Sequence, residues 1–203
     1  MKNKKIKNKK KVYVGLSADI LHKDHINILK KANKFGDVTV GLLTDKAIAS
    51  YKKLPHLNYD QRELVLKNIR YVKKVIPQDT RSYKNNLIKI RPDFVVHEDN
   101  KWKEGIQKNI RLEIKKLLSG WSGKLIEIRS NKIFDEKEIE KNELRIGSSP
   151  QERVSKLKRL MDSKSIVRIL ESHNALTGLI IETLKVKRKK TFDEFDGIWS
   201  SSL

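Results

Sequence analysis

Two histidines, His22 and His25, stand three residues apart at the expected start of a helix, directly after a short apolar run. Because an α-helix repeats every 3.6 residues, both imidazole rings can face one point. The first turn of a helix also offers backbone N–H groups and the positive end of the helix dipole, which favour phosphate. Imidazoles at such a place can stabilise the charge that grows on a bridging oxygen as pyrophosphate leaves. The pair therefore indicates chemistry on a nucleotide triphosphate.

Spacing alone leaves other interpretations of this pair open. Two surface histidines on a polar turn give the same HxxH pattern, and an isolated HxxH is more often of that kind. A zinc site is a weaker interpretation, because no third ligand of suitable spacing is nearby. Cysteine is absent from all 203 residues, which excludes a disulfide scaffold, a thiolate nucleophile and a cysteine zinc site.

The elements that must position the histidines alternate along the chain. Apolar runs predict strands at residues 12–16, 38–43, 72–76, 93–97 and 124–128. Helical spacing predicts helices at residues 26–35, 60–69, 83–90 and 103–118. The alternation predicts an α/β fold with a doubly wound parallel sheet of five strands and helices on both faces. Ligands of such a sheet bind at the carboxyl ends of its strands.

Three local features refine this prediction. Pro77 is expected to stop the third strand, and residues 44–59, which include Pro55, are expected to form a long mobile loop. In the helix at 60–69, we expect the apolar side chains at 64, 65 and 69 to face inward.

The character of the chain changes after the fifth strand. We expect a charged helix at 135–143, a boundary at 147–150 and a basic connecting helix at 151–161. A strand, a helix and a strand then follow at 165–171, 175–184 and 195–200. The predicted organisation is a basic tail (1–11), a main domain (12–145), a linker helix (146–164) and a C-terminal segment (165–203). So small a βαβ unit cannot bury both faces of its sheet, so it must dock elsewhere or stay poorly ordered.

The formal net charge of +21 calls for anionic partners. Lysines are spread over all segments and aromatic residues make up 6% of the chain, so we expect nonspecific, salt-sensitive binding rather than a specific nucleic-acid function. No apolar run approaches the roughly 18–20 residues that span a bilayer. The positive N-terminus is not followed by the apolar core of a signal peptide. The expectation is a cytoplasmic protein that does not contact a membrane.

Several ordered motifs resemble those of the cytidylyltransferase-like nucleotidyltransferases, whose signature is HxGH. They are GLSADILHKDH (15–25), TDKAIASYK (44–52), YDQRELVLKNIRYVKKVIP (59–77) and VVHEDNKW (95–102). The resemblance spans residues 11–139 and implies a Rossmann-like fold. It also implies that an anionic oxygen of a small phosphonate or phosphate acceptor attacks the α-phosphorus of CTP, and that pyrophosphate leaves with the help of Mg²⁺. A homodimer is plausible for the family.

The resemblance also implies a role for individual residues. The implied roles are backbone contacts to the nucleotide, ordering of the turn, stabilisation of the transferring phosphates and closure over the triphosphate. The candidates for catalysis are His22, His25, Lys53, Arg62 and Arg70. The candidates for nucleotide binding are Leu16, Ser17, Ala18, Asp19, Lys52, Asp99, Trp102 and Arg129. No residue is predicted to ligate a resident metal.

The sequence departs from the family pattern at three places. Asp24 stands where HxGH has glycine, residues 97–102 replace a GDDW-like segment, and Phe134 and Asp135 replace hydroxyl residues after Arg129. A carboxylate about 4 Å from a phosphate costs about 1 kcal/mol in water and about 4 kcal/mol at an effective dielectric of 20. Since each 1.36 kcal/mol in a barrier is tenfold in rate, Asp24 would remove about one to three decades unless it points to solvent or helps to bind metal. A nucleotide-binding pseudo-enzyme is therefore the alternative function, and a basic nucleic-acid binder is a weaker one.

The C-terminal motifs LESHNALTGLIIE (170–182) and FDGIWSSSL (195–203) resemble the opening of the phosphoenolpyruvate mutase/isocitrate lyase type of barrel. The resemblance implies an incomplete βαβ piece of a (β/α)8 barrel, with Trp199, Ser201 and Leu203 at substrate-framing positions and Ser202 where glycine is usual. The later acidic Mg²⁺ ligands of such a barrel are absent, so mutase activity is not expected. Nucleotidyltransferases joined to this mutase occur in phosphonate biosynthesis, which is the pathway that the two resemblances together imply.

Overall fold

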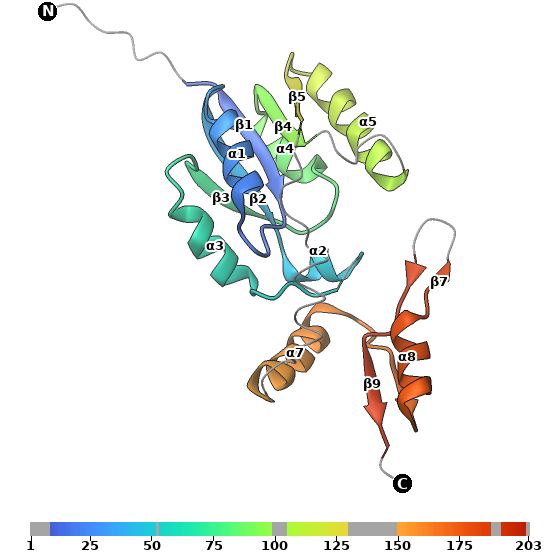
Figure 1. Cartoon of the computed structure of the whole chain (residues 1–203). Coiled ribbons are helices and arrows are strands. Elements are labelled where there is room, and N and C mark those ends of the chain that lie inside the picture. The colour runs from blue at the N-terminus through green and yellow to red at the C-terminus, as the bar shows by residue number, and fades with distance from the viewer. Residues whose placement is uncertain (1–8, 52, 99–104, 130–149, 188–191, 202–203) are drawn as a thin grey trace, which may run out of the picture. The chain divides into compact units, whose positions relative to one another are not determined.

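The computed structural model describes residues 9–51, 53–98, 105–129, 150–187 and 192–201 (Figure 1). The chain forms two compact units. The first comprises residues 1–44 and 56–136, and the second comprises residues 45–55 and 137–203. The segment 45–55 therefore belongs with the C-terminal part of the chain, although the residues on both sides of it belong to the first unit.

A parallel sheet of five strands forms the centre of the first unit. Its strands are β1 (Lys11–Leu16), β2 (Asp37–Leu43), β3 (Lys74–Gln78), β4 (Phe94–Glu98) and β5 (Lys124–Ile128). Their order is β3-β2-β1-β4-β5, with every pair parallel, which confirms the predicted α/β sheet. The chain adds β2 and β3 on one side of β1 and then adds β4 and β5 on the other side. The carboxyl ends of β1 and β4 thus form the topological switch point, where ligands of such sheets bind.

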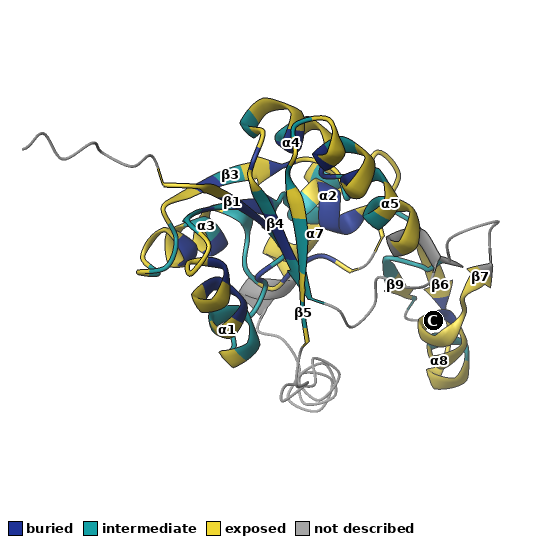
Figure 2. Cartoon of the chain, turned by 90° about the horizontal axis from the view of Figure 1, so that it is seen from above, coloured by how far each residue is buried: buried dark blue, intermediate teal, exposed yellow. Residues whose placement is uncertain are grey.

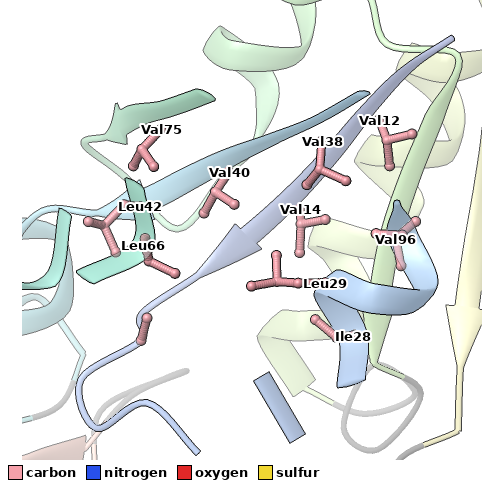
Figure 3. Close-up of a cluster of buried hydrophobic side chains, with 12 residues drawn as sticks. Val12, Val14, Ile28, Leu29, Val38, Val40, Leu42, Leu66, Val75 and Val96 are labelled. Carbon is pink, nitrogen blue, oxygen red and sulfur yellow. The ribbon is translucent and has the colours of Figure 1, made fainter. Parts of the chain in front are cut away.

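Helices cover both faces of this sheet. They are α1 (Lys23–Ala32), α3 (Tyr59–Lys67), α4 (Lys84–Ile90) and α5 (Gly105–Ser119). One core cluster joins Val12 and Val14 of β1 to Leu29 of α1 and Leu66 of α3 (Figure 3). A second cluster packs Tyr13, which points to the other face of β1, against Leu87 of α4 and Leu118 of α5.

Burial in the two units differs. Figure 2 shows buried residues in the strands β1 and β4, whereas α8 of the second unit is largely exposed. Consecutive residues of β1 serve the two clusters in turn, because side chains alternate along a strand. The doubly wound arrangement therefore follows directly from the apolar run at 12–16.

Three local predictions about the first unit need correction. The helix α1 begins at Lys23 rather than at 26, because His22 caps it. The strand β3 continues through Pro77, because β3 is an edge strand, where proline is tolerated, and the Pro77 carbonyl accepts a hydrogen bond from the side chain of Asn86. In α3 the buried residues are Arg62 and Leu66, whereas Leu64 and Val65 are 64% and 42% exposed. Ile69, just after the helix, packs against the core as predicted.

The predicted loop at 44–59 contains a short helix, α2 (Asp45–Ala49). Ala47, Ile48 and Ala49 are buried, so this stretch is not a loop throughout. A helix of five residues is too short to show apolar periodicity in the sequence. The prediction of a continuous loop was therefore wrong for this part.

The second unit also contains α7 (Pro150–Ser163), β6 (Ile169–Ser172), α8 (Ala175–Thr183), β7 (Val186–Lys187), β8 (Phe192–Asp193) and β9 (Gly197–Ser200). The strands β6 and β9 pair in parallel and α8 packs on both, which confirms a strand–helix–strand unit. The antiparallel pair β7–β8 was not predicted. Assignment of this unit to a (β/α)8 barrel stays a prediction, and the helix expected at 135–143 lies outside the described residues.

Candidate functional site

The turn after β1 has an unusual backbone conformation. Ala18 adopts a φ of 46°, in the left-handed region, and is buried. This conformation costs a residue with a Cβ about 1–2 kcal/mol. Strain of this kind persists only where the surrounding structure holds it. The contacts that hold this turn therefore also fix the start of α1.

His22 and His25 form a reciprocal cap at the start of α1. The Nδ1 atom of His22 accepts a hydrogen bond from the N–H of Asp24 at 3.3 Å, and the Nδ1 atom of His25 accepts one from the N–H of His22 at 3.4 Å. The ring centroids are 4.0 Å apart. Since an Nδ1 atom that accepts carries no proton, both neutral rings have their proton on Nε2. The cap therefore orients two Nε2–H donors at the positive end of a helix, at the switch point of the sheet.

Asp24 lies against this pair instead of pointing to solvent. Its carboxylate is 3.7 Å from His22 Nδ1, and its side chain is only 13% exposed. Within the described part of the chain, no group of three or more histidine, cysteine or acidic residues could hold a metal ion. A negative charge thus stands beside the position that a phosphate would take.

Asp19 joins the turn after β1 to the segment that precedes α3. Its Oδ1 atom accepts a hydrogen bond from the N–H of Leu57 at 3.2 Å, and its Oδ2 atom is 4.0 Å from Nε2 of His56. The carboxylate thus accepts a backbone hydrogen bond and lies close to a neighbouring imidazole. Through these contacts Asp19 limits the movement of the turn that leads to His22.

Arg62, a catalytic candidate, is buried, with only 1% of its surface exposed. Its guanidinium donates from Nη1 to the carbonyls of Ser17 (2.6 Å) and Leu43 (2.8 Å), and from Nε to the carbonyl of Leu57 (3.1 Å). These carbonyls lie after β1, at the end of β2 and before α3. The structure therefore makes Arg62 a positioning residue that joins three backbone segments, which differs from the predicted contact with acceptor and phosphates.

Arg70, another catalytic candidate, is not brought to the histidines. It precedes β3, whereas His22 and His25 follow β1, and the two strands run parallel in one sheet. Arg70 therefore lies at the amino edge of the sheet, opposite the switch point. The guanidinium is exposed and stacks on Tyr71, with a hydrogen bond from Nη2 to the Tyr71 hydroxyl at 2.6 Å. The seven residues between the arginines include the second half of α3, a helix that returns the chain to that edge.

The remaining candidates fall into three groups. Leu16, Ser17 and Ala18 form the carboxyl end of β1 and the turn after it, where backbone atoms can meet a ligand. Lys53 is exposed and belongs to the second unit, and Arg129 is exposed and follows the edge strand β5. Lys52, Asp99 and Trp102 lie outside the described residues.

Sequence reasoning missed Tyr83 and His97 at the switch point. The Tyr83 hydroxyl donates to the carbonyl of Gly15 at 3.4 Å, and its ring lies near that of His97, with centroids 6.2 Å apart. A Cβ at Gly15 would fall 2.3 Å from the Tyr83 ring, so a larger residue there would have to displace that ring. A glycine inside an apolar strand marks such a close approach, and Gly15 in VYVGL was the available signal.

Burial lowers the pKa of His97 to about 4. Its Nδ1 atom lies 2.8 Å from the carbonyl of Glu98, which can only accept, so Nδ1 carries the proton of the neutral ring. His97 ends β4 together with Glu98, beside the carboxyl end of β1. The switch point thus contains a neutral imidazole in addition to the capped pair.

This fold, with a helix-terminal histidine pair at its switch point, defines an α/β protein suited to nucleotides. The family described as "Cytidylyltransferase-like" matches residues 13–120, which is more than half of the chain. The chain belongs to this cytidylyltransferase-like family. The resemblance of the residues around HKDH to that family is thereby confirmed.

Two curated relatives are nucleotidyltransferases. A FAD synthase of Archaeoglobus fulgidus is 31% identical over 103 residues, which are 47% of this chain and 75% of the relative. A glycerol-3-phosphate cytidylyltransferase of Bacillus subtilis is 34% identical over 93 residues, which are 45% of this chain and 72% of the relative. These similarities support a cytidylyltransferase-like enzyme.

A solved structure supports the fold alone. The lipopolysaccharide core biosynthesis protein of Thermoplasma volcanium is 20% identical, with a TM-score of 0.51, and the match covers 63% of this chain and 99% of that one. None of the helices in the described ranges is long and apolar enough to cross a membrane.

Proposed function

We propose that this chain transfers CMP from CTP to a small phosphonate or phosphate acceptor and releases pyrophosphate. The observation that carries this proposal is the reciprocal cap of His22 and His25, which directs two Nε2–H donors to the start of α1 at the switch point. Relatives named glycerol-3-phosphate cytidylyltransferase support the choice of CTP and of an acceptor that carries a phosphate group.

The transfer is a displacement at phosphorus. An anionic acceptor oxygen forms a bond to the α-phosphorus of CTP, and the bond from that phosphorus to the bridging oxygen breaks. The negative charge moves to the departing pyrophosphate, where the two Nε2–H groups stabilise it. The net charge of +21 favours the approach of both anions.

Mg²⁺ enters as part of the substrate. No group of three suitable ligands exists among the residues that the structure describes, so phosphate oxygens and water would hold the ion. The protein then contributes positioning and electrostatic stabilisation, which are the main sources of catalysis in phosphoryl-type transfers.

The acceptor would belong to phosphonate biosynthesis. The support is the resemblance of LESHNALTGLIIE and FDGIWSSSL to the opening of a phosphoenolpyruvate mutase barrel. The parallel pairing of β6 with β9 across α8 fits the first βαβ unit of such a barrel.

A second candidate function is nucleotide binding without turnover. The observation that favours it is the carboxylate of Asp24, 3.7 Å from His22 Nδ1 and mostly shielded from solvent. Repulsion between this charge and the transferring phosphates would raise the barrier more than it weakens binding, if charge on those phosphates grows as the reaction proceeds.

Titration of the full chain with CTP and Mg²⁺, followed by assay of pyrophosphate release, separates these functions. Glycerol 3-phosphate and a small alkylphosphonate serve as acceptors, and ATP serves as the nucleotide control. Saturable CTP binding with acceptor-dependent pyrophosphate release supports transfer. Binding without release supports the second candidate, and absence of binding to either nucleotide rejects both.

A further inference from the structure

Exposed cations gather at the amino edge of the five-stranded sheet, the edge at which its parallel strands begin. Each of the five strands opens with an exposed lysine or arginine, or follows one within three residues. In strand order these residues are Lys11, Lys34, Lys74, Arg91 and Lys124. The lysines are spread along the sequence, but the fold brings them to one side of the first unit.

The helices of the first unit add lysines to the same edge. Each helix between two parallel strands runs back against the strand direction, so its last turn reaches the amino edge. The last turns of the four helices contain the exposed residues Lys31, Lys67, Lys89 and Lys116. The positive charge therefore comes from the ends of the helices as well as from the starts of the strands.

Backbone hydrogen bonds make this edge continuous. The N–H of Asp37 donates to the carbonyl of Lys10 at 2.8 Å, which joins the starts of β2 and β1. The N–H of Lys124 donates to the carbonyl of Asp93 at 2.8 Å, which joins β5 to β4. Neighbouring strands lie about 4.8 Å apart, so the cations form a connected surface and not isolated charges.

Few acidic side chains offset these cations. Near the starts of the strands, the acidic residues that the structure describes are Asp37 and Asp93. The carboxylate of Asp37 lies 3.8 Å from Nζ of Lys9, and that of Asp93 accepts from the N–H of Lys11 at 2.7 Å. A large excess of positive charge remains at the edge.

The proposed transfer reaction does not use this charge. The histidine pair lies at the carboxyl edge, on the other side of the sheet. Acidic residues stand at that edge, after the strands or at the start of a helix; they are Asp19, Asp24, Asp60, Asp79 and Glu98. CTP bound at the histidine pair would therefore not contact the cations of the amino edge.

Helix electrostatics explain only part of the pattern. A cation in the last turn of a helix stabilises the helix dipole, which accounts for lysines such as Lys31 and Lys89. A sheet has only a small net dipole, so the same argument gives no reason for the cations at the starts of the strands. Lysines that protect a sheet from pairing with another chain belong on edge strands, whereas Lys11 opens the central strand β1.

Aromatic rings lie among the cations. Phe35 is 37% exposed, and its ring centroid is 5.3 Å from that of Phe94, over which Nζ of Lys10 lies at 5.2 Å. Before β3, the exposed guanidinium of Arg70 lies 4.8 Å from the ring of Tyr71. Nucleobases stack on exposed aromatic rings and on guanidinium planes, whereas lysines bind the phosphates between the bases.

We propose that the amino edge of the sheet binds single-stranded nucleic acid without sequence preference. The lysines contact the phosphates, and Phe35 and Arg70 offer surfaces on which bases stack. A duplex hides the faces of its bases, so a single strand binds more tightly. This activity goes beyond the proposed transfer reaction and does not depend on it.

The first test measures binding of the full chain to a fluorescent oligothymidylate of about 16 nucleotides, by fluorescence anisotropy. The oligothymidylate should bind more tightly than a DNA duplex of the same length. The logarithm of its association constant should fall linearly with the logarithm of salt concentration, by about 0.7 for each phosphate contact. An excess of CTP with Mg²⁺ should not displace it, because the histidine pair lies at the other edge.

Variants locate the site. The double variant Lys10→Ala with Lys74→Ala removes two phosphate contacts, so affinity at about 0.1 M salt should fall about 25-fold and the salt slope by about 1.4. Lys156→Ala with Lys158→Ala removes the same charge from exposed positions on α7 and should change affinity by less than about twofold. Phe35→Leu keeps an apolar side chain but loses the stacking surface, so affinity should fall about tenfold with an unchanged salt slope.

Three results would overturn the proposal. Equal weakening in the two double variants would assign binding to the overall charge of the chain. Unchanged affinity in Phe35→Leu would mean that the edge takes any polyanion, and inorganic polyphosphate would then compete as well as the oligothymidylate does. Displacement by CTP would place the oligothymidylate at the histidine pair. If the chain binds the oligothymidylate as expected but releases no pyrophosphate from CTP, the proposed function fails and the nucleic-acid surface stands.

Discussion

Arg62 donates a hydrogen bond from Nη1 to the backbone carbonyl of Ser17 at 2.6 Å, so a buried residue of α3 holds the turn that follows β1. The next residue in that turn, Ala18, has the left-handed backbone. Asp19 adds a second link by accepting from the N–H of Leu57, whose carbonyl also accepts from Arg62. The start of α1 is therefore fixed by contacts between segments some 40 residues apart in the chain.

Replacement of Arg62 by alanine should destabilise the protein strongly. Three carbonyls would lose their charged donor, and a cavity would remain beside Leu66. We expect a loss of about 3–5 kcal/mol in the free energy of unfolding, measured by urea denaturation. Arg70→Ala is the control and should change this energy by less than about 0.5 kcal/mol, because Arg70 is exposed. Equal small losses in both variants would show that Arg62 does not hold the turn.

The substitution His22→Asn should separate helix capping from chemistry. Asparagine is among the best N-cap residues, so the free energy of unfolding should change by less than about 0.5 kcal/mol. The Nε2–H donor is lost, and pyrophosphate release should slow by about 10²–10³-fold, as when one oxyanion donor is removed. His22→Ala, the comparison variant, should lose about 1 kcal/mol of stability in addition. A His22→Asn protein with an unchanged rate would leave His22 with a capping role alone.

The sequence predicted the sheet because each strand is marked by residues that are neighbours in the chain. Apolar runs such as 38–43 mark buried parallel strands, and the structure has β2 at Asp37–Leu43. The role of Arg62 was not predictable in this way, because its partners Ser17 and Leu43 are distant in sequence. The same burial explains why Leu64 and Val65 were wrongly expected to face inward, since a charged residue, Arg62, occupies a buried position where the pattern requires an apolar one.

Motif resemblance found the histidine pair but not the geometry around it. HKDH shows two histidines and a replaced glycine, whereas only coordinates show that both Nδ1 atoms accept from backbone N–H groups. The orientation of Asp24 depends on the same cap, because its own N–H donates to His22 and so places its carboxylate beside that ring. Arg62 and Arg70 look equivalent in the motif, yet α3 separates them to opposite edges of the sheet.

Removal of the charge at Asp24 should increase turnover. Asp24→Asn keeps the shape of the side chain and eliminates the repulsion of the transferring phosphates. At an effective dielectric between those of water and a protein surface, kcat/KM for CTP should rise about tenfold. Asp60→Asn is the matched control, a first-turn carboxylate on α3, and should leave kcat/KM unchanged. A lower rate in Asp24→Asn would mean that the carboxylate assists the reaction, for instance by orienting His22.

Gly41→Ala should destabilise the sheet through a steric clash. A Cβ at Gly41 would lie 1.7 Å from the hydroxyl oxygen of Tyr13, which is buried and donates to Oε1 of Gln78 at 2.7 Å. Relief of the clash must displace this hydrogen bond, so we expect a loss of at least about 1–3 kcal/mol in thermal or urea unfolding. At Gly197 the nearest atom to a new Cβ is 3.7 Å away, and Gly197→Ala should be close to neutral. Similar losses in both variants would contradict the close approach of Tyr13 to β2.

The pKa of His97 predicts how stability depends on pH. The folded-state pKa is about 4, and an unfolded histidine titrates near 6.5. Between these values the unfolded chain binds more protons, so the contribution of His97 is complete above about pH 6.5 and is lost as the pH falls toward 4. The loss should reach up to about 3 kcal/mol, reduced by the partial exposure of the ring. In urea denaturation from pH 4 to 8, His97→Asn should show a shallower dependence on pH than the unaltered chain. Identical slopes would mean that His97 titrates alike in both states.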